Sequence, residues 1–173
     1  MKQLIITILI VLLSQTFSFS QTDTTSLKQE KFKHSVGFAV GLTTGYGLSY
    51  RYAFDKFEVQ LAFAPIKNSY ETRINTGLTF FYKLVETKYT TFFLYQGNSY
   101  TYSKSTYYLF KENEMESYDE ETIEEHNFNN GIGIGIRFII LKRVGLQFMA
   151  GYASIHNFQE INFTGETGVY FRF

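Results

Sequence analysis

The sequence predicts an all-β fold, an eight-stranded antiparallel up-and-down transmembrane β-barrel. The first of three supporting observations is composition: among 173 residues there are 14 Tyr and 19 Phe but one Pro and no Cys, which favours strands and excludes a disulfide scaffold. The second is a hydrophobic pattern of period two that recurs along the chain. The third is that glycines gather on one face of this pattern.

Residues 1–20 are interpreted as a signal peptide. Lys2 precedes an apolar run, Leu4 to Leu13, that is too short to span a bilayer as a helix, and Ser18 and Ser20 supply a small-x-small cleavage pattern. Residues 21–33 are polar and read as a flexible lead-in, so that the barrel domain is expected over 34–173. Export through this peptide would place the protein outside the cytoplasm.

The alternation is clearest in two neighbouring runs, 46–54 and 57–64, in which every second residue is large and apolar. Only Asp55 and Lys56 separate them, which predicts a hairpin. The other predicted strands are 36–42, 74–84, 89–96, 132–140, 144–152 and 169–173. Both faces of 89–96 are apolar, so the pattern leaves its register open. Tight turns at 55–56, 86–88 and 141–143 alternate with longer connections at 65–72, 97–129 and 154–164.

The glycine-rich face indicates which side of the sheet is interior. Glycine weakens a strand unless something packs closely against it, and a narrow eight-stranded barrel needs small residues inside. The large residues would then face lipid, with Tyr50, Leu61 and Ile134 as markers. A soluble lipocalin-like barrel with the opposite orientation is the alternative fold. Aromatic girdles are expected at Tyr52, Phe54, Phe57, Tyr82, Tyr89, Phe138, Phe171 and Phe173, and at Tyr46, Phe63, Tyr95 and Tyr152.

The C-terminus carries a family resemblance. The last seven residues follow the pattern of the β-signal of bacterial outer-membrane barrels, which is a polar residue, a glycine, and aromatics at the antepenultimate and final positions. These positions are Thr167, Gly168, Phe171 and Phe173. With the signal peptide and eight runs, the chain resembles the small eight-stranded OmpA/OmpX-type outer-membrane β-barrel family over about residues 34–173. The resemblance implies that these four residues form a barrel-assembly signal recognised by the outer-membrane assembly machinery, and that the protein resides in the bacterial outer membrane in contact with its lipid.

Several charged and amide residues fall on the predicted inner face and are expected to form a polar network in the lumen. Pairing across the two-residue turn sets Arg51 opposite Gln60, with Glu58 one diagonal away, and a turn at 141–143 sets Arg137 opposite Gln147. The proposed network is Arg51, Glu58, Gln60, Lys83, Arg137, Gln147 and Arg172. Because several cations would lie near one acid, the network could also hold trapped water or an anion. A narrow pore and a solid core both remain open.

The longest connection contains two candidate contact surfaces. Residues 111–126 carry eight carboxylates without the spacing of a calcium loop, which favours a solvated acidic loop. The residues before it form an aromatic cluster that would either extend the fifth strand or act as a recognition surface for an extracellular protein or other surface partner. The cluster is Tyr100, Tyr102, Tyr107, Tyr108 and Phe110.

The sequence favours a non-enzymatic stem whose loops 97–129 and 154–164 carry recognition. A lipid A-modifying enzyme using His126, Ser154 and His156 and a narrow solute channel are the alternatives. No phosphate loop, dinucleotide fingerprint or HExxH motif is present, so neither cofactor nor metal is expected. With 16 Lys+Arg and 16 Asp+Glu, no nucleic-acid partner is expected either. A monomer is the expected state.

Overall fold

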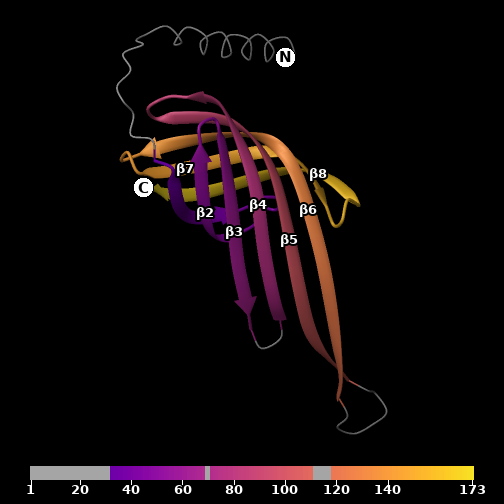
Figure 1. Ribbon diagram of the computed structural model, residues 1–173. Helices are drawn as coiled ribbons and strands as arrows, with labels where there is room; N and C mark the ends of the chain where they lie inside the picture. The colour runs from indigo at the N-terminus through magenta and orange to yellow at the C-terminus, as the bar shows by residue number, and fades with distance from the viewer. Residues whose placement is uncertain (1–31, 69–70, 111–117) are drawn as a thin grey trace, which may run out of the picture. The chain divides into compact units, whose positions relative to one another are not determined.

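The computed structural model describes residues 32–68, 71–110 and 118–173, without the side chains of 107–110 and 118–121. The predicted signal peptide and most of the lead-in lie outside the described residues. Eight strands follow one another along the chain (Figure 1). Their bounds are β1 His34–Val40, β2 Gly47–Phe54, β3 Phe57–Lys67, β4 Glu71–Glu86, β5 Thr90–Phe110, β6 Tyr118–Ile140, β7 Val144–Ile155 and β8 Glu160–Arg172.

The strands form a closed barrel in the order β1 to β8, each antiparallel to the next. Closure is made by β1 and β8, whose register runs from Ser35 opposite Arg172 to Val40 opposite Thr167. His34 and Phe173 also exchange backbone hydrogen bonds at the end of this seam. The predicted fold class is therefore confirmed. No helix in the described part of the chain is long and apolar enough to cross a membrane.

The side-chain alternation places large apolar residues outside and small or polar residues inside. Tyr50, Leu61 and Ile134 are 42%, 54% and 64% exposed. On the opposite face of the same strands, Arg51 and Gln60 are buried. This orientation excludes the lipocalin-like alternative, because a soluble barrel would bury its apolar face.

An aromatic core fills the middle of the barrel and settles the register of β5. Phe93 and Tyr95 point inward and pack with Phe81 and Met149 in one buried cluster. Glycines lie directly opposite on β6: Gly135 faces Phe93 and Gly133 faces Tyr95. A Cβ at either glycine would overlap the facing ring. Tyr95 was expected in an outer girdle, and that prediction is wrong because Gly133 leaves the room inside that its ring occupies.

Rings line the outer surface at the end of the barrel that carries the short turns. Tyr52, Phe54, Phe57 and Tyr82 form a continuous row, with successive ring centroids 6.1, 5.8 and 5.1 Å apart. The other residues expected in this girdle are exposed as well: Tyr89, Phe138, Phe171 and Phe173. An aromatic belt of this kind is typical of the interface between membrane and water.

The two segments expected to be recognition loops are largely strand. β5 and β6 stay paired from Thr90 opposite Phe138 to Phe110 opposite Tyr118, and both run well past their neighbours (Figure 1). β7 and β8 likewise fill most of 154–164, leaving a turn at 156–159. The loop boundaries 97–129 and 154–164 are therefore wrong. In these segments polar and charged residues such as Ser103, Lys104 and Glu124 interrupt the apolar alternation, so the period-two signal weakens although backbone pairing continues.

Candidate functional site

Two arginines and one glutamate form the centre of the lumen. Arg137 on β6 donates two hydrogen bonds to Glu58 on β3, Nη1 to Oε1 at 3.0 Å and Nη2 to Oε2 at 2.7 Å. Arg137 also donates to Oε1 of Gln147, its cross-strand neighbour on β7. Because all three side chains are buried, this bidentate ion pair ties opposite walls of the barrel together.

Arg51 on β2 is the second buried cation, and its contacts with carboxylate are poor. Its Nη1 lies 3.5 Å from Oε2 of Glu58, whereas its Nη2 donates to Oε1 of Gln60 at 2.6 Å. Aromatic rings cover the guanidinium on two sides, with its Cζ 4.5 Å from the Phe81 centroid and 4.0 Å from the Tyr170 centroid. Ring faces and an amide oxygen therefore compensate much of this buried charge.

Lys83 and Arg172 lie on the inner face but hydrogen-bond to none of the described network members. Lys83 Nζ instead pairs with Oε2 of Glu86 at 2.9 Å. Arg172 stacks its guanidinium over the Phe32 ring at 5.3 Å. Of the seven residues expected in the lumen network, the structure links Arg51, Glu58, Gln60, Arg137 and Gln147 by hydrogen bonds. Tyr170, which donates to Oε1 of Gln60 at 3.0 Å, is a member that sequence reasoning did not single out.

The connection between β1 and β2 folds into the other end of the lumen and fills it. Its centre, Thr43 and Thr44, is completely buried. Thr43 donates its N–H and its hydroxyl to Oε1 of Glu166, and Thr44 donates its N–H to Oε2. We name residues 41–46 the plug, because they close the barrel where the longest strands emerge.

Glycines and amides on other strands accommodate the plug. A Cβ at Gly77 on β4 would overlap the Thr44 carbonyl oxygen, and one at Gly97 on β5 would lie 2.8 Å from the Thr43 carbonyl oxygen. Tyr46 N–H donates to Oδ1 of Asn75 at 2.9 Å. Sequence reasoning missed Glu166 and the plug, although Glu166 alternates in step with the inward-facing Gly168 and Tyr170 on the final strand.

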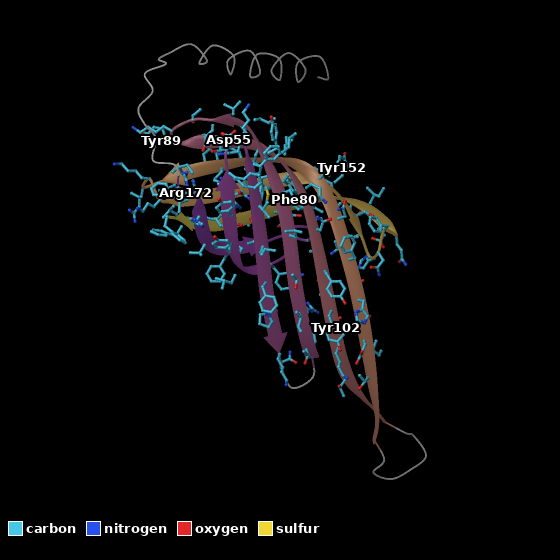
Figure 2. The ribbon with its side chains drawn as sticks, in the orientation of Figure 1. Asp55, Phe80, Tyr89, Tyr102, Tyr152 and Arg172 are labelled. Carbon is cyan, nitrogen blue, oxygen red and sulfur yellow. The ribbon has the colours of Figure 1, made fainter. Side chains whose placement is uncertain are left out.

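We name the part of β3–β6 that continues past the plug the extension. On its outer face the Tyr100 hydroxyl and Nδ1 of His126 share a hydrogen bond of 2.6 Å, and the Tyr102 and His126 rings lie 5.2 Å apart. Figure 2 shows Tyr102 on the extension, far from Asp55, Tyr89 and Arg172 at the short-turn end. The backbone of Tyr107, Tyr108 and Phe110 belongs to β5. Their side chains lie outside the described residues. Of the acidic segment, residues 111–117 and the side chains of 118–121 are also outside them, whereas the backbone of 118–126 belongs to β6 and not to a loop.

An exposed ion pair joins the two strands of the extension. Lys104 Nζ lies 2.9 Å from Oε1 of Glu124, its direct cross-strand partner. The hydrogen bond to Lys104 lowers the pKa of Glu124, and the same bond raises the pKa of Lys104. Both side chains are exposed, so water screens the pair and it contributes little to the stability of the sheet.

The residues considered for lipid chemistry do not form a catalytic arrangement. Nδ1 of His156 lies 3.9 Å from Oε2 of Glu160 within one turn, and His126 is engaged by Tyr100. Among the described residues no hydrogen bond links Ser154 to either histidine. The described residues also contain no group of three or more His, Cys, Asp or Glu side chains placed to hold a metal ion.

A closed eight-stranded barrel with an apolar outer surface and a polar, charged interior is the architecture of a transmembrane β-barrel. No protein-family model matches the chain, and no curated protein matches it. Solved structures similar to it include three outer-membrane barrels. A major outer membrane protein from Thermus thermophilus is 14% identical, with 82% of this chain and 98% of that chain covered and a TM-score of 0.49.

The other two are Neisserial surface protein A and the N-terminal β-barrel domain of Pseudomonas aeruginosa OprF. The first is 13% identical, with 81% of this chain and 94% of that chain covered and a TM-score of 0.47. The second is 16% identical, with 81% and 95% covered and a TM-score of 0.46. The likeness to all three structures is one of fold alone.

Proposed function

We propose that this protein is an integral outer-membrane β-barrel whose closed barrel is a non-enzymatic stem and whose extension recognises a protein or surface outside the cell. The observation that carries the proposal is strand length. β5 has 21 residues and β6 has 23, whereas about 9–11 residues cross a bilayer. At roughly 3.3 Å per residue, β5 measures about 70 Å, so about half of the hairpin stands clear of the membrane.

The outer surface supports the membrane location. Outward residues on β2, β3 and β5, such as Leu48, Phe63 and Leu94, are large, apolar and 62%, 51% and 42% exposed. Water disfavours an apolar wall of this extent, and hydrocarbon does not. The barrel has no free edge within this band, which satisfies the requirement that every backbone group in lipid be paired.

The filled lumen supports a stem rather than a channel. Arg137, Glu58 and Arg51 cross it on the short-turn side, the core around Phe93 fills its middle, and the plug closes the other end. The interior of an eight-stranded barrel is just wide enough for its own side chains. We therefore expect no measurable conductance from the purified protein in planar bilayers, and steady single-channel currents would count against a stem.

The C-terminal residues support assembly by the outer-membrane machinery. Phe171 and Phe173 are 44% and 51% exposed on the barrel wall, next to the β1–β8 seam. Gly168 leaves the space that the Tyr170 ring occupies inside. We infer that Thr167, Gly168, Phe171 and Phe173 are recognised as an assembly signal, that residues 1–20 direct export, and that the assembled protein is a monomer surrounded by outer-membrane lipid.

The proposal is tested by site-specific photocrosslinking in intact cells. A crosslinking amino acid at Tyr102, on the extension, should capture a partner in the external medium or on a neighbouring surface. The same amino acid at Tyr89, 63% exposed at the short-turn end, is the matched control and should capture nothing added from outside. Capture of an external partner at Tyr89 but not at Tyr102 would show that the barrel lies in the membrane in the opposite orientation, with its short turns outside the cell. Recovery of the protein with soluble periplasmic contents would refute the membrane location.

A further inference from the structure

Eight buried side-chain atoms have no hydrogen-bond partner in the described part of the chain, and four of them lie on the inner wall of three successive strands, β2, β3 and β4. These four are Ser49 Oγ, Arg51 Nε, Gln60 Nε2 and Thr79 Oγ1. All four residues are at most 2% exposed. A buried polar group left without a partner is costly, so several of them in one place indicate a bound species.

The strand register brings these residues together. Arg51 on β2 lies opposite Gln60 on β3, and Gln60 lies opposite Thr79 on β4. Ser49 is two residues from Arg51 on the same face of β2. Directly opposed residues on one face have Cβ atoms roughly 5 Å apart. The four residues therefore form one continuous patch of the wall.

The patch offers mainly donors. Oε1 of Gln60 already accepts hydrogen bonds from Nη2 of Arg51 and from the Tyr170 hydroxyl, which fixes the amide so that its NH₂ group points away from them. An amide NH₂ and a guanidinium Nε–H can only donate, and a hydroxyl can donate as well as accept. The missing partner must therefore have lone pairs and must accept from several groups at once.

Charge distinguishes an anion from a water molecule. The centre of the lumen holds two buried guanidinium groups and one carboxylate, and Glu58 gives both of its oxygens to Arg137 at 3.0 Å or less while Arg51 approaches no closer than 3.5 Å. The next buried carboxylate, Glu166, is four residues from Tyr170 along β8, which corresponds to about 13 Å. The two guanidinium groups therefore share one carboxylate, and the cluster keeps one excess positive charge, on the side of Arg51, where the contact with Glu58 is longer.

We propose that the inner wall of β2–β4 binds a small monovalent anion, with chloride as its natural occupant. The anion accepts hydrogen bonds from Nε of Arg51, the NH₂ group of Gln60 and the hydroxyl of Thr79, which lie side by side on β2, β3 and β4. It balances the excess positive charge that remains because Arg51 and Arg137 share the single carboxylate of Glu58. The site is part of the barrel's interior and is independent of any partner of the extension.

Bromide tests the site directly because it replaces chloride and scatters anomalously. Crystals of the full chain grown with sodium bromide should show one anomalous peak within hydrogen-bond distance of Arg51 Nε and Gln60 Nε2. Density without anomalous signal at that position would mean that water alone satisfies these donors, and would overturn the proposal.

Unfolding of the purified protein in detergent micelles gives a second, independent readout. The thermal midpoint, followed by the mobility shift of the folded barrel in gels, should rise with chloride and saturate, compared with sodium gluconate at equal ionic strength. Thr79→Val should weaken this dependence. Gln60→Glu should abolish it, because the introduced carboxylate supplies Arg51 with a fixed counter-charge.

Thr164→Val is the matched control for Thr79→Val. Thr164 is also buried on the inner wall with an unpartnered hydroxyl, but it lies on β8 two residues from Glu166. Its substitution should change the midpoint equally in both salts and leave the chloride dependence intact. An equal chloride effect in all four proteins would be a general salt effect and would overturn the proposal.

Discussion

Replacing Glu58 with glutamine is expected to destabilise the barrel by about 3–5 kcal/mol, the range found when one member of a buried ion pair is removed. The structure supports a value in this range. Glu58 is 4% exposed and accepts two hydrogen bonds from Arg137 while contacting Arg51. Glutamine keeps the shape and one acceptor, but its NH₂ group then faces a guanidinium N–H, and two buried cations lose their shared anion.

The measurement is equilibrium unfolding by urea in phospholipid vesicles, followed by tyrosine fluorescence and by the gel mobility of the folded barrel. Glu86→Gln is the matched control. Glu86 pairs with Lys83 at a similar distance, 2.9 Å, but its side chain is 38% exposed, so the free energy of unfolding should fall by at most about 1 kcal/mol. The same chemical change at two depths thus isolates the effect of burial.

A double-mutant cycle checks that the effect of Glu58→Gln acts through Arg137. Arg137→Gln removes the charge that the first substitution leaves unpaired, so the double variant should be less destabilised than the sum of the two single variants. Additive losses would show that Glu58 and Arg137 are not coupled. A loss for Glu58→Gln within about 1 kcal/mol of the loss for Glu86→Gln would refute the central role given to this ion pair.

Two further predictions concern the plug and the extension. Gly77→Ala should sharply lower the yield of folded barrel, because the added Cβ overlaps the Thr44 carbonyl oxygen. Gly165→Ala is the control and should fold normally, because no atom lies within 4 Å of its Cβ position. Equal yields of the two variants in a refolding assay would contradict the packing described for the plug. Glu124 should titrate below an ordinary glutamate, since its pKa is lowered by Lys104. The Lys104–Glu124 ion pair is therefore complete above the ordinary pKa of a glutamate, and it is lost as the pH falls through the lowered pKa of Glu124. An ordinary glutamate pKa for Glu124, measured by NMR titration of its carboxyl resonance, would contradict the ion pair.

The register of the first hairpin is predictable because it depends on local features alone. A two-residue turn at Asp55 and Lys56 allows one pairing in which both apolar faces coincide, and it sets Arg51 opposite Gln60, as observed. The 141–143 turn likewise sets Arg137 opposite Gln147. Where a turn is short and the two faces differ in polarity, sequence determines which side chains share the interior.

The inner aromatic core could not be predicted in the same way. The run from Phe92 to Tyr95 is apolar on both faces, so polarity does not choose between the two registers. The choice is made by β6, where Gly133 and Gly135 face Tyr95 and Phe93 and leave room for their rings. That information lies about 40 residues away in the chain, and it becomes usable only once the pairing of β5 with β6 is known.

The plug shows why inward glycines can be misinterpreted. The glycine face was expected because a narrow barrel needs small residues inside. Near Arg137 it makes room for a long polar side chain, since Gly145 lies against the aliphatic part of Arg137. At the other end Gly77, Gly97 and Gly131 instead make room for Thr43 and Thr44. A short polar connection that enters the lumen has the same local sequence as one in water. The groups that hold it in the lumen, such as Glu166, Asn75 and the facing glycines, all lie on other strands. The position of the plug therefore depends on tertiary structure and cannot be predicted from its own sequence.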